Sequence, residues 1–411
     1  MVLNKRKIIN DPIYGFVSIN NALIYDIIEH RYFQRLRRIR QLGLTDYVYP
    51  GALHTRFHHA LGAMHLMTLA LNSLREKGHF IWDNEFEAAQ IAILLHDVGH
   101  GPFSHTLEYS LIKNVNHEKL GLSIFKKLNE DFDGRLNLAI QMFSGTYHRP
   151  FFNQLISSQL DVDRLDYLKR DSFFTGVVEG NIGSERIIKL LDVSNDNLVV
   201  EEKGIYSVES FLNARRIMYW QVYLHKTSVA VERMMIEVIQ RAKDLVRAGQ
   251  RVPATPVFQH FLERDYSMDD FESDAQLLEL FTLLDDTDIW SSVKMWMSHE
   301  DKVLRLLSKM IVERKLFKIE ITSDAVDKER RDIIVGKVCS DYGLSKEDSK
   351  YFVCKGGISN AAYLPKEKSI YVHHKSGNIS DIAAASDLPN IKAMRKIVKK
   401  NYLCWPKNIS L

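Results

Sequence analysis

Residues 85–97 read EFEAAQIAILLHD, and this segment limits what the chain can fold into. Apolar residues occur on nearly every side of the helix that the segment predicts, as expected of a helix buried in a core. The segment nevertheless ends on His96 and Asp97, two polar side chains. From residue 21 to about residue 314 the patterns are mostly helical, so we expect a mainly α fold in which this helix is central.

Several other segments carry regular patterns. Residues 55–78 and 299–315 predict one helix each, and residues 215–249 predict a long helix or a kinked pair. Residues 197–203 and 204–210 look like the two strands of a small hairpin instead.

The composition changes near residue 316. The patterns there predict two strands, a helix between them and a basic helix at the end, at residues 316–323, 368–377, 327–343 and 390–405 respectively. The acidic residues 265–276 predict an exposed loop. We therefore expect a helical core over residues 1–315 and a smaller C-terminal α/β lobe over residues 316–411.

The composition narrows the class of protein. The chain has 411 residues, of which 45% are hydrophobic, which is enough for one large core or two domains and too much for disorder. A net charge of +3 neither requires nor excludes nucleic acid as a partner. Three cysteines without a CxxC pair suggest a reduced protein with no disulfide framework or thiolate zinc site. We see no signal peptide and no apolar run of roughly 18 residues, so we expect a cytoplasmic protein without a membrane partner.

Residues 94–105 read LLHDVGHGPFSH, which places three histidines and an aspartate at the end of the buried helix. Two glycines and a proline predict a sharp turn there, and His100 and His105 lie in the same run. A lone buried His-Asp step is more often structural than metal-binding. Burying this many polar groups is costly unless they are paired or bind a metal, so the neighbourhood favours a metal site.

Further ligands have to come from elsewhere in the chain. The run TRFHHALG offers His58 and His59, and the run QLDVDRLDYLKRD offers four aspartates, Asp161, Asp163, Asp166 and Asp171. Two histidines and two aspartates suit Mn²⁺, Fe²⁺ or Mg²⁺, and histidine favours the transition metals. Four protein ligands would leave coordination positions open for water and a substrate oxygen.

With these runs the chain resembles the HD-domain phosphohydrolases, and more closely the deoxynucleoside triphosphate triphosphohydrolases, the branch that includes the mammalian SAM-and-HD-domain enzyme. The resemblance covers about residues 10–320 and implies an HD-domain helical core. It is carried by DPIYGF (11–16), FQRLRRIRQLG (33–43), YPGALHTRFHHALG (49–62), LLHDVGHGPFSH (94–105), DVDRLDYLKRD (161–171) and DIWSSVKMW…ERKLFK (288–318).

The resemblance implies a metal site made of His59, His96, Asp97 and Asp163. It implies one divalent ion, either manganese, iron or magnesium, with nickel or zinc as substitutes in a crystal. It also implies the reaction, in which water activated by the metal attacks the α-phosphorus of a deoxynucleoside triphosphate (dNTP). The products would be the deoxynucleoside and inorganic triphosphate.

The resemblance also implies roles in catalysis and substrate binding. His105 corresponds to the general acid, and His100, His117 and Glu108 complete the catalytic group. The phosphate-binding positions are Arg56, Arg164, Arg215 and Lys226, with Tyr219 near the phosphates. The sugar and base positions are Gln41, Leu42, Tyr167 and Asp171, and Tyr223 stands beside a base position.

The chain departs from the family pattern in places. Glu108 replaces an aspartate that partners the general acid, and Arg164 replaces a lysine. Tyr219 replaces a histidine near the phosphates, and Leu224 replaces a glutamine near the base. These changes leave the base preference open.

Two other functions stay open at the level of sequence. The same metal site would serve a nucleotidase or phosphodiesterase that acts on another phosphate ester. It would also serve a nucleotide sensor with little turnover. The resemblance further implies a homo-oligomer, dimer or tetramer, and it leaves an allosteric nucleotide open.

Overall fold

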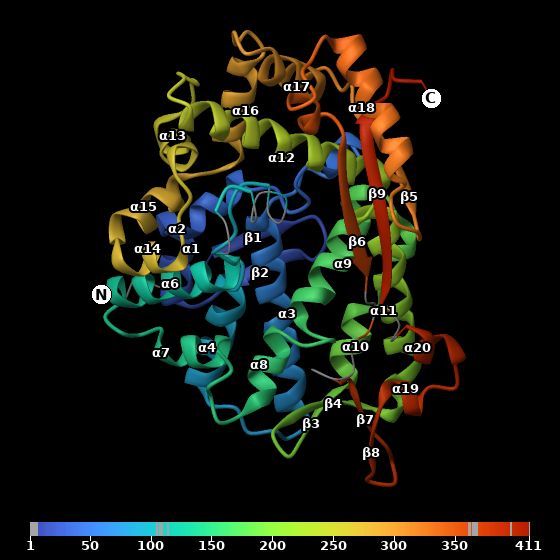
Figure 1. Cartoon of the computed structure of the whole chain (residues 1–411). Coiled ribbons are helices and arrows are strands. Elements are labelled where there is room, and N and C mark those ends of the chain that lie inside the picture. The colour runs from blue at the N-terminus through green and yellow to red at the C-terminus, as the bar shows by residue number, and fades with distance from the viewer. Residues whose placement is uncertain are drawn as a thin grey trace.

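The computed structural model describes residues 7–103, 106, 110–112, 115–360, 363, 369–394 and 397–410. These residues form a mainly helical fold with small sheets at its edges, as Figure 1 shows. The mainly α prediction is therefore confirmed. Within the described ranges every helix is too short or too polar to cross a membrane.

The first half of the described chain is helical after a short N-terminal hairpin. Its helices are α1 (Ala22–Glu29), α2 (Arg31–Gln34), α3 (Arg56–Glu76), α4 (Asp83–Leu95), α6 (His117–Asp131), α7 (Asn137–Phe143), α8 (Pro150–Ile156), α9 (Val162–Thr175) and α10 (Ser184–Leu190). Helix α4 is the predicted buried helix. It packs against α3, and α3 packs against α9, so these three helices form the centre of the core.

The second half contains the remaining helices. These are α11 (Ile205–Met218), α12 (Lys226–Arg247), α13 (Pro256–Glu263), α14 (Met268–Ser273), α15 (Ala275–Leu283), α16 (Asp286–Trp296), α17 (Lys302–Val312), α18 (Lys328–Tyr342), α19 (Ile382–Ala385) and α20 (Pro389–Ala393). A single π-helical turn, Tyr219–Tyr223, joins α11 to α12, which confirms the kinked pair. Isolated π turns are frequent at functional sites, because they redirect side chains within a helix.

The described strands form three sheets. An antiparallel hairpin pairs β1 (Lys7–Asp11) with β2 (Gly15–Ile19). The second sheet has the order β3-β4-β7-β8, with bounds Leu191–Ser194, Asn197–Glu201, Tyr371–His373 and Ile379–Asp381. The third sheet has the order β5-β9-β6, with bounds Phe317–Thr322, Val398–Pro406 and Cys354–Asn360.

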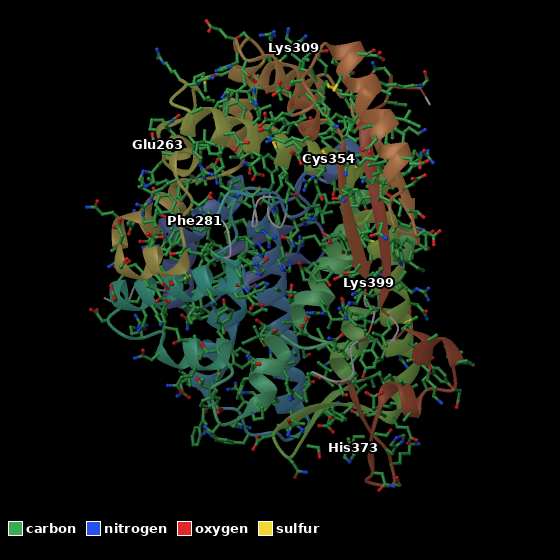
Figure 2. The ribbon with its side chains drawn as sticks, viewed as in Figure 1. Glu263, Phe281, Lys309, Cys354, His373 and Lys399 are labelled. Atoms are coloured by element: carbon green, nitrogen blue, oxygen red, sulfur yellow. The ribbon has the colours of Figure 1, made fainter. Side chains whose placement is uncertain are left out.

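The two C-terminal sheets are joined to the helical core. Strand β7 lies parallel to β4, with Val200 opposite Val372, and strand β5 packs against α12. Figure 1 shows β5, β6 and β9 side by side next to α18. Cys354 of β6, labelled in Figure 2, lies opposite Cys404 of β9, and both side chains are buried.

The hairpin prediction was wrong in its second strand. Ile205 begins α11, and the partner of β4 is β3, which precedes it in the chain. Asn195 and Asp196 both take positive φ angles, 50° and 56°, between β3 and β4. Two central residues with positive φ are what a tight two-residue hairpin turn requires, and Asn and Asp tolerate this conformation.

Two further predictions were wrong. The second half of the basic helix predicted at residues 390–405 is the strand β9, and α20 covers only the start. β9 is the middle strand of its sheet because it pairs with both β5 and β6, and its Tyr402–Trp405 stretch is buried. The loop predicted at residues 265–276 is largely α14 and the start of α15. Ser267 and Asp270 form a capping box for α14, and Phe271 is buried. The acidic residues of this segment therefore belong to a helix and not to a loop.

Candidate metal centre and active site

The end of α4 presents the two residues that follow it to the interior. His96 caps the helix, and the backbone then turns tightly, with the His100 amide donating to the Asp97 carbonyl at 3.1 Å. A Cβ at Gly99 would lie 2.1 Å from the His117 carbonyl oxygen, so only glycine allows α6 to start this close. The approach stacks the His117 ring on that of His100, with centroids 3.8 Å apart.

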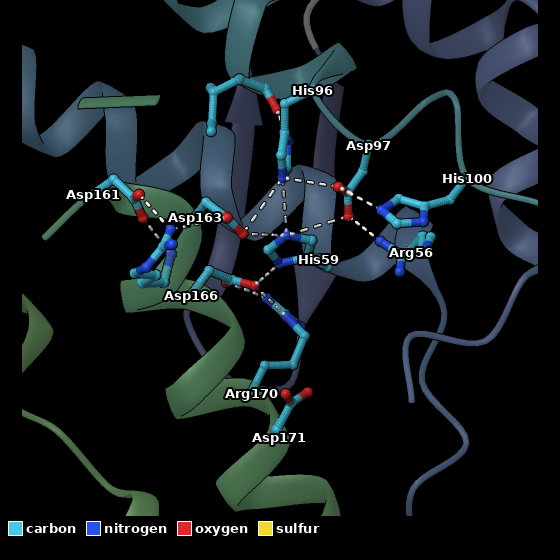
Figure 3. Close-up of polar contacts among 12 residues, drawn as sticks. Arg56, His59, His96, Asp97, His100, Asp161, Asp163, Asp166, Arg170 and Asp171 are labelled. Atoms are coloured by element: carbon cyan, nitrogen blue, oxygen red, sulfur yellow. Dashed lines mark hydrogen bonds and ion pairs between the residues drawn. The ribbon is translucent and has the colours of Figure 1, made fainter. Parts of the chain in front are cut away.

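Three helices bring the predicted metal ligands together, as Figure 3 shows. His59 comes from α3, His96 from the end of α4 and Asp163 from the first turn of α9. The two histidine Nε2 atoms are 3.3 Å apart, and Oδ1 of Asp163 lies 3.1 Å from that of His59 and 3.4 Å from that of His96. Among the described residues these three form the group that could hold a metal ion.

Asp97 lies at the edge of this group. Its Oδ1 is 3.4 Å from Nε2 of His96, and its Oδ2 is 3.7 Å from Nε2 of His59. The same carboxylate is ion-paired with Arg56. Asp97 is therefore placed to be the fourth ligand, and Arg56 holds its Oδ2.

The four residues fit a divalent transition metal. Ligand atoms about 2.1 Å from one ion and at right angles to each other are separated by about 3.0 Å, which is close to the separations seen here. Two imidazoles and two carboxylates are also a suitable ligand set for manganese or iron. The resemblance to HD-domain proteins implies a divalent metal, and the ligand geometry agrees with that expectation.

Each of the two histidines is oriented by a polar contact at its Nδ1 atom. Nδ1 of His59 lies 2.7 Å from Oδ2 of Asp166, and Nδ1 of His96 lies 2.6 Å from the Ile93 carbonyl oxygen. When Nδ1 carries the proton for such a bond, Nε2 is left with its lone pair facing the cluster. Arg170 in turn donates to both oxygens of Asp166, each at 2.9 Å.

The charges of the site are strongly coupled. Burial disfavours the charged form of His59, yet its bonds to Asp163 and Asp166 raise its pKa to about 10. Burial likewise opposes ionisation of Asp163, but His59 and His96 hold the pKa of that carboxyl well below its usual range. Burial and Arg56 together lower the pKa of His100. The carboxylates of the site are therefore anionic, and they favour a proton on His59. A bound metal ion would supply this positive charge in place of the proton.

A cavity of about 730 Å³ opens beside the metal group. Asp97, His100, His117 and Asp163 line it, which places the candidate metal centre in its wall. Eight of the predicted substrate residues also line it: Gln41, Leu42, Arg56, Arg164, Tyr167, Asp171, Tyr219 and Tyr223. Its volume is in the range of pockets that hold a nucleotide-sized ligand.

Two predicted phosphate-binding residues are placed differently. Arg215 is buried outside the cavity wall and donates to Gln159 at 2.9 Å. Lys226 is exposed at the first position of α12 and is also outside the wall. His105 and Glu108 lie outside the described residues.

The remaining candidates from the sequence have structural roles in the described chain. Nδ1 of His58 accepts from the Thr55 amide at 3.2 Å and helps to cap α3. Asp161 caps α9, where it accepts from the Arg164 backbone and side chain, each at 2.7 Å. Arg164 is thereby held in the wall of the cavity by a neighbouring carboxylate.

The carboxylate of Asp171 is held by residues from two distant parts of the chain. One oxygen lies 2.8 Å from Nε2 of His54, and the other accepts from the Tyr223 hydroxyl at 2.7 Å. His54 is buried and stacks on Phe174, with ring centroids 4.5 Å apart. His54 was not among the residues that the sequence singled out, although it stands two residues before Arg56 in the motif YPGALHTRFHHALG.

Helix α12 adds a wall that the sequence did not predict. Glu232, Arg233 and Ile236 line the cavity. Their spacing in the sequence indicates only that they belong to a helix. They lie about 70 residues after the last metal ligand, so no local pattern connects them to the site.

The chain matches two family models. Residues 56–171 match the model described as HD domain, and residues 182–252 match the HD associated region. The first match contains all four candidate metal ligands. The second covers α11, the π turn and α12, and the π turn and α12 contribute residues to the wall of the cavity.

Relatives and solved structures agree with these matches. The chain is 36% identical over 323 residues to the uncharacterized protein YwfO of Bacillus subtilis, covering 77% of this chain and 72% of the relative. It is 26% identical over 435 residues to the human deoxynucleoside triphosphate triphosphohydrolase SAMHD1, covering 88% and 67%. The crystal structure of a phosphohydrolase from Bacteroides thetaiotaomicron is similar with a TM-score of 0.95 and 50% identity, covering 98% of this chain and all of the other.

Proposed function

This chain belongs to the HD-domain family of metal-dependent phosphohydrolases, and on that basis we propose that it hydrolyses dNTPs to the deoxynucleoside and inorganic triphosphate. The observation that carries the proposal is the cavity, whose wall brings Asp97 and Asp163 of the candidate metal group together with Arg56, Arg164, Tyr167 and Asp171. A relative of this chain bears the name of that activity.

A divalent ion bound by His59, His96, Asp97 and Asp163 would lower the pKa of water and neutralise phosphate charge. We propose manganese, iron or magnesium as the ion. The two histidines favour a transition metal over magnesium.

The arginines of the wall are placed to bind a triphosphate. Arg56 is buried and paired with Asp97, so its guanidinium is fixed beside the metal group. Arg164 is held by Asp161. Positive groups that are already oriented stabilise the charge that develops on the α-phosphoryl oxygens and on the rest of the triphosphate while the bond to the 5′-oxygen breaks.

Tyr167 and Asp171 lie one turn apart on α9 and are proposed to hold the deoxyribose. Burial raises the pKa of Tyr223, which donates to Asp171, so that tyrosine stays a neutral donor. Tyr167 forms an edge contact with the Tyr223 ring at 6.1 Å. A packed tyrosine under the sugar would exclude a 2′-hydroxyl by crowding.

The proton for the departing 5′-oxygen of the deoxynucleoside is proposed to come from His105, with His100 as the rival donor. His100 and His117 are stacked in the cavity wall, where they could contact phosphate oxygens. Glu108 is proposed to orient His105.

We further propose that residues 316–411 contribute to a homo-oligomer and to its regulation by a nucleotide. Light scattering of the full chain with and without dNTPs and metal tests this proposal. A protein that stays monomeric at micromolar concentration in all conditions, yet turns over dNTPs without a lag, would remove it.

The test of the function is product identification. The protein is incubated with each dNTP, each ribonucleotide and a cyclic dinucleotide in the presence of Mn²⁺. We expect inorganic triphosphate from dNTPs. Monophosphate or pyrophosphate would indicate a nucleotidase or phosphodiesterase instead, and binding without turnover would indicate a sensor.

A further inference from the structure

One carboxyl group on the cavity wall has no partner among the described residues. Glu232 lies in the second turn of α12, partly buried, and shares the wall with Ile236 one turn later. The other described carboxyl groups of the wall are paired: Asp97 with Arg56, Asp163 with His59 and His96, and Asp171 with His54 and Tyr223. Among the described residues none forms a hydrogen bond or ion pair with Glu232.

The neighbours of Glu232 do not compensate its charge. Arg233 follows it directly, but adjacent helical side chains diverge by about 100°. The Arg233 guanidinium is instead paired with Glu237 at 2.5 Å. The segment Gln41–Thr45, which also lines the cavity and leads into a turn packed on α12, carries no charged side chain. Burial alone therefore raises the pKa of Glu232 to about 8.

A lone carboxyl group in a ligand cavity is best explained by a ligand that donates hydrogen bonds to it. The metal group and the proposed sugar residues occupy the parts of the wall built from α3, α4 and α9. The same cavity wall has apolar side chains from Leu42, Leu224 and Ile236, the last of them one turn from Glu232 on α12, and a flat base can stack against such side chains. This wall is where the base of a nucleotide would lie.

Resting on the proposed function, we infer that Glu232 reads the base of the bound nucleotide and selects guanine. Guanine has two adjacent donors on its pairing edge, the N1–H and the 2-amino group, and a carboxylate can accept from both at once. Adenine and cytosine place a donor beside an acceptor, and thymine places one donor between two acceptors. A carboxylate has nothing to donate to those acceptors, so it disfavours the other three bases.

The variant Glu232→Gln tests this directly, because a glutamine amide offers one acceptor and one donor. That pattern matches adenine and cytosine instead of guanine. We expect the wild type to favour dGTP over dATP in kcat/KM by about 10- to 100-fold, the discrimination typical of a bidentate contact, and the variant to lose or reverse that preference. Asp244→Asn is the matched control. It makes the same carboxyl-to-amide change on α12, about 18 Å further along the helix, and it should leave the preference unchanged.

Proton release on binding of dGTP distinguishes a contact between Glu232 and the base from a purely structural role of Glu232. At pH 7 a carboxyl group with a pKa of about 8 is mostly protonated, and binding of guanine requires the anion. Binding of dGTP to the wild type with metal chelated should therefore release close to one proton more than binding to Glu232→Gln. Calorimetry in two buffers of different ionisation enthalpy measures the difference.

The outcomes separate this inference from the proposed function. Equal kcat/KM for all four dNTPs, or a variant that keeps the wild-type ranking, would overturn the role of Glu232 and leave the dNTP activity standing. Selective binding of dGTP without release of triphosphate would refute the activity and support the role of Glu232. Absence of both binding and turnover of dGTP would overturn both.

Discussion

His59 contributes both ring nitrogens to the candidate metal centre. Its Nε2 faces His96 and Asp163, and its Nδ1 bonds Asp166. Asp166 is itself held by Arg170, and Arg170 also donates to Asp11 near the N-terminus at 2.8 Å. A ligand oriented through such a chain loses its direction when a distant member changes.

Asp166→Asn is expected to weaken metal binding by about 10- to 100-fold without removing a ligand, because the amide holds the His59 ring less firmly. Titration of the metal-free protein with Mn²⁺ measures the affinity. Asp192→Asn is the matched control, since Asp192 bonds His79 at 2.5 Å away from the cavity. Equal affinity in Asp166→Asn and wild type would show that the ring needs no such support.

The pKa of Asp166 also predicts that the metal-free protein becomes less stable in acid. Burial opposes its ionisation, but Arg170 and His59 lower the pKa of Asp166 to about 2. A folded-state pKa below the unfolded value of about 3.9 adds stability above pH 4 that is lost as the pH falls toward 2. The difference in free energy of unfolding between wild type and Asp166→Asn should shrink by about 1–2 kcal/mol from pH 6 to pH 2.5. Denaturant unfolding at both pH values measures it, and a constant difference would contradict the assignment.

Tyr167→Ala is expected to weaken the discrimination between dGTP and GTP, because the ring that would crowd a 2′-hydroxyl is gone. The ratio of the two kcat/KM values measures the effect. The exposed Tyr206 of α11 provides a control substitution to alanine that should leave the ratio unchanged. If Tyr167→Ala rejects ribose as well as wild type does, the steric account is wrong.

The sequence was informative about residues that stand in dense local runs. His96 and Asp97 are adjacent, and His59 and Asp163 each stand in a run of polar residues that follows a recognisable spacing. His54 and Glu232 carry no such signal, because their importance depends on contacts with residues 117 positions away or on a cavity formed by several helices.

At the scale of elements, the crossing of α3 and α9 holds the site together. A Cβ on Gly62 of α3 would lie 2.0 Å from Oδ1 of Asp166 and 2.1 Å from a guanidinium nitrogen of Arg170, both on α9. The buried Asp166–Arg170 pair therefore occupies the space that a side chain at position 62 would need. This close approach is what lets His59 and Asp163 meet.

Gly62→Ala is expected to destabilise the fold by about 1–3 kcal/mol, because the extra carbon forces the two helices apart. Metal affinity should fall with it. Gly336→Ala is the matched control in α18, where a Cβ meets open space, and it should stabilise by about 0.4–1 kcal/mol. Thermal unfolding of both variants decides the matter, and a neutral Gly62→Ala would mean that the helices relax without cost.

Helices with a clear apolar pattern were predictable, including α3, α4, α17 and α18. The errors fell where charge or spacing was ambiguous. The basic run that ends in β9 carries lysines at helical spacing, but its pairing with β5 and β6 buries Tyr402–Trp405 and decides the outcome. Tertiary context of this kind overrides local propensity.

At the scale of the whole molecule, the last hundred residues are joined to the helical body at several points. The Phe317 amide contacts the Met234 sulfur at 3.3 Å, Arg241 is paired with Asp348 at 3.2 Å, and Trp405 is buried. The division at residues 315 and 316 stays a prediction. The joining of β7 to β4 could not be predicted, because the two strands are about 170 residues apart and neither has a pattern that selects the other.

A chain that ends at residue 315 is expected to lose cooperative thermal unfolding, because α12 and β4 would expose surfaces that β5 and β7 cover in the full chain. Circular dichroism during heating compares the two chains at equal concentration. A truncated chain that unfolds cooperatively at the temperature of the full chain would show that residues 316–411 add nothing to its stability.

The pairing of β4 with β7 has a consequence for how the protein is made. A ribosome that adds about 5–20 residues per second needs about 10–30 s to synthesise the stretch between Val200 and Val372. During that interval the free edge of β4 is available to other nascent chains, since an unpaired strand edge is a template for pairing. Translation speed after residue 200 and the holdase chaperones that meet the nascent chain therefore influence how much of this protein reaches its folded state.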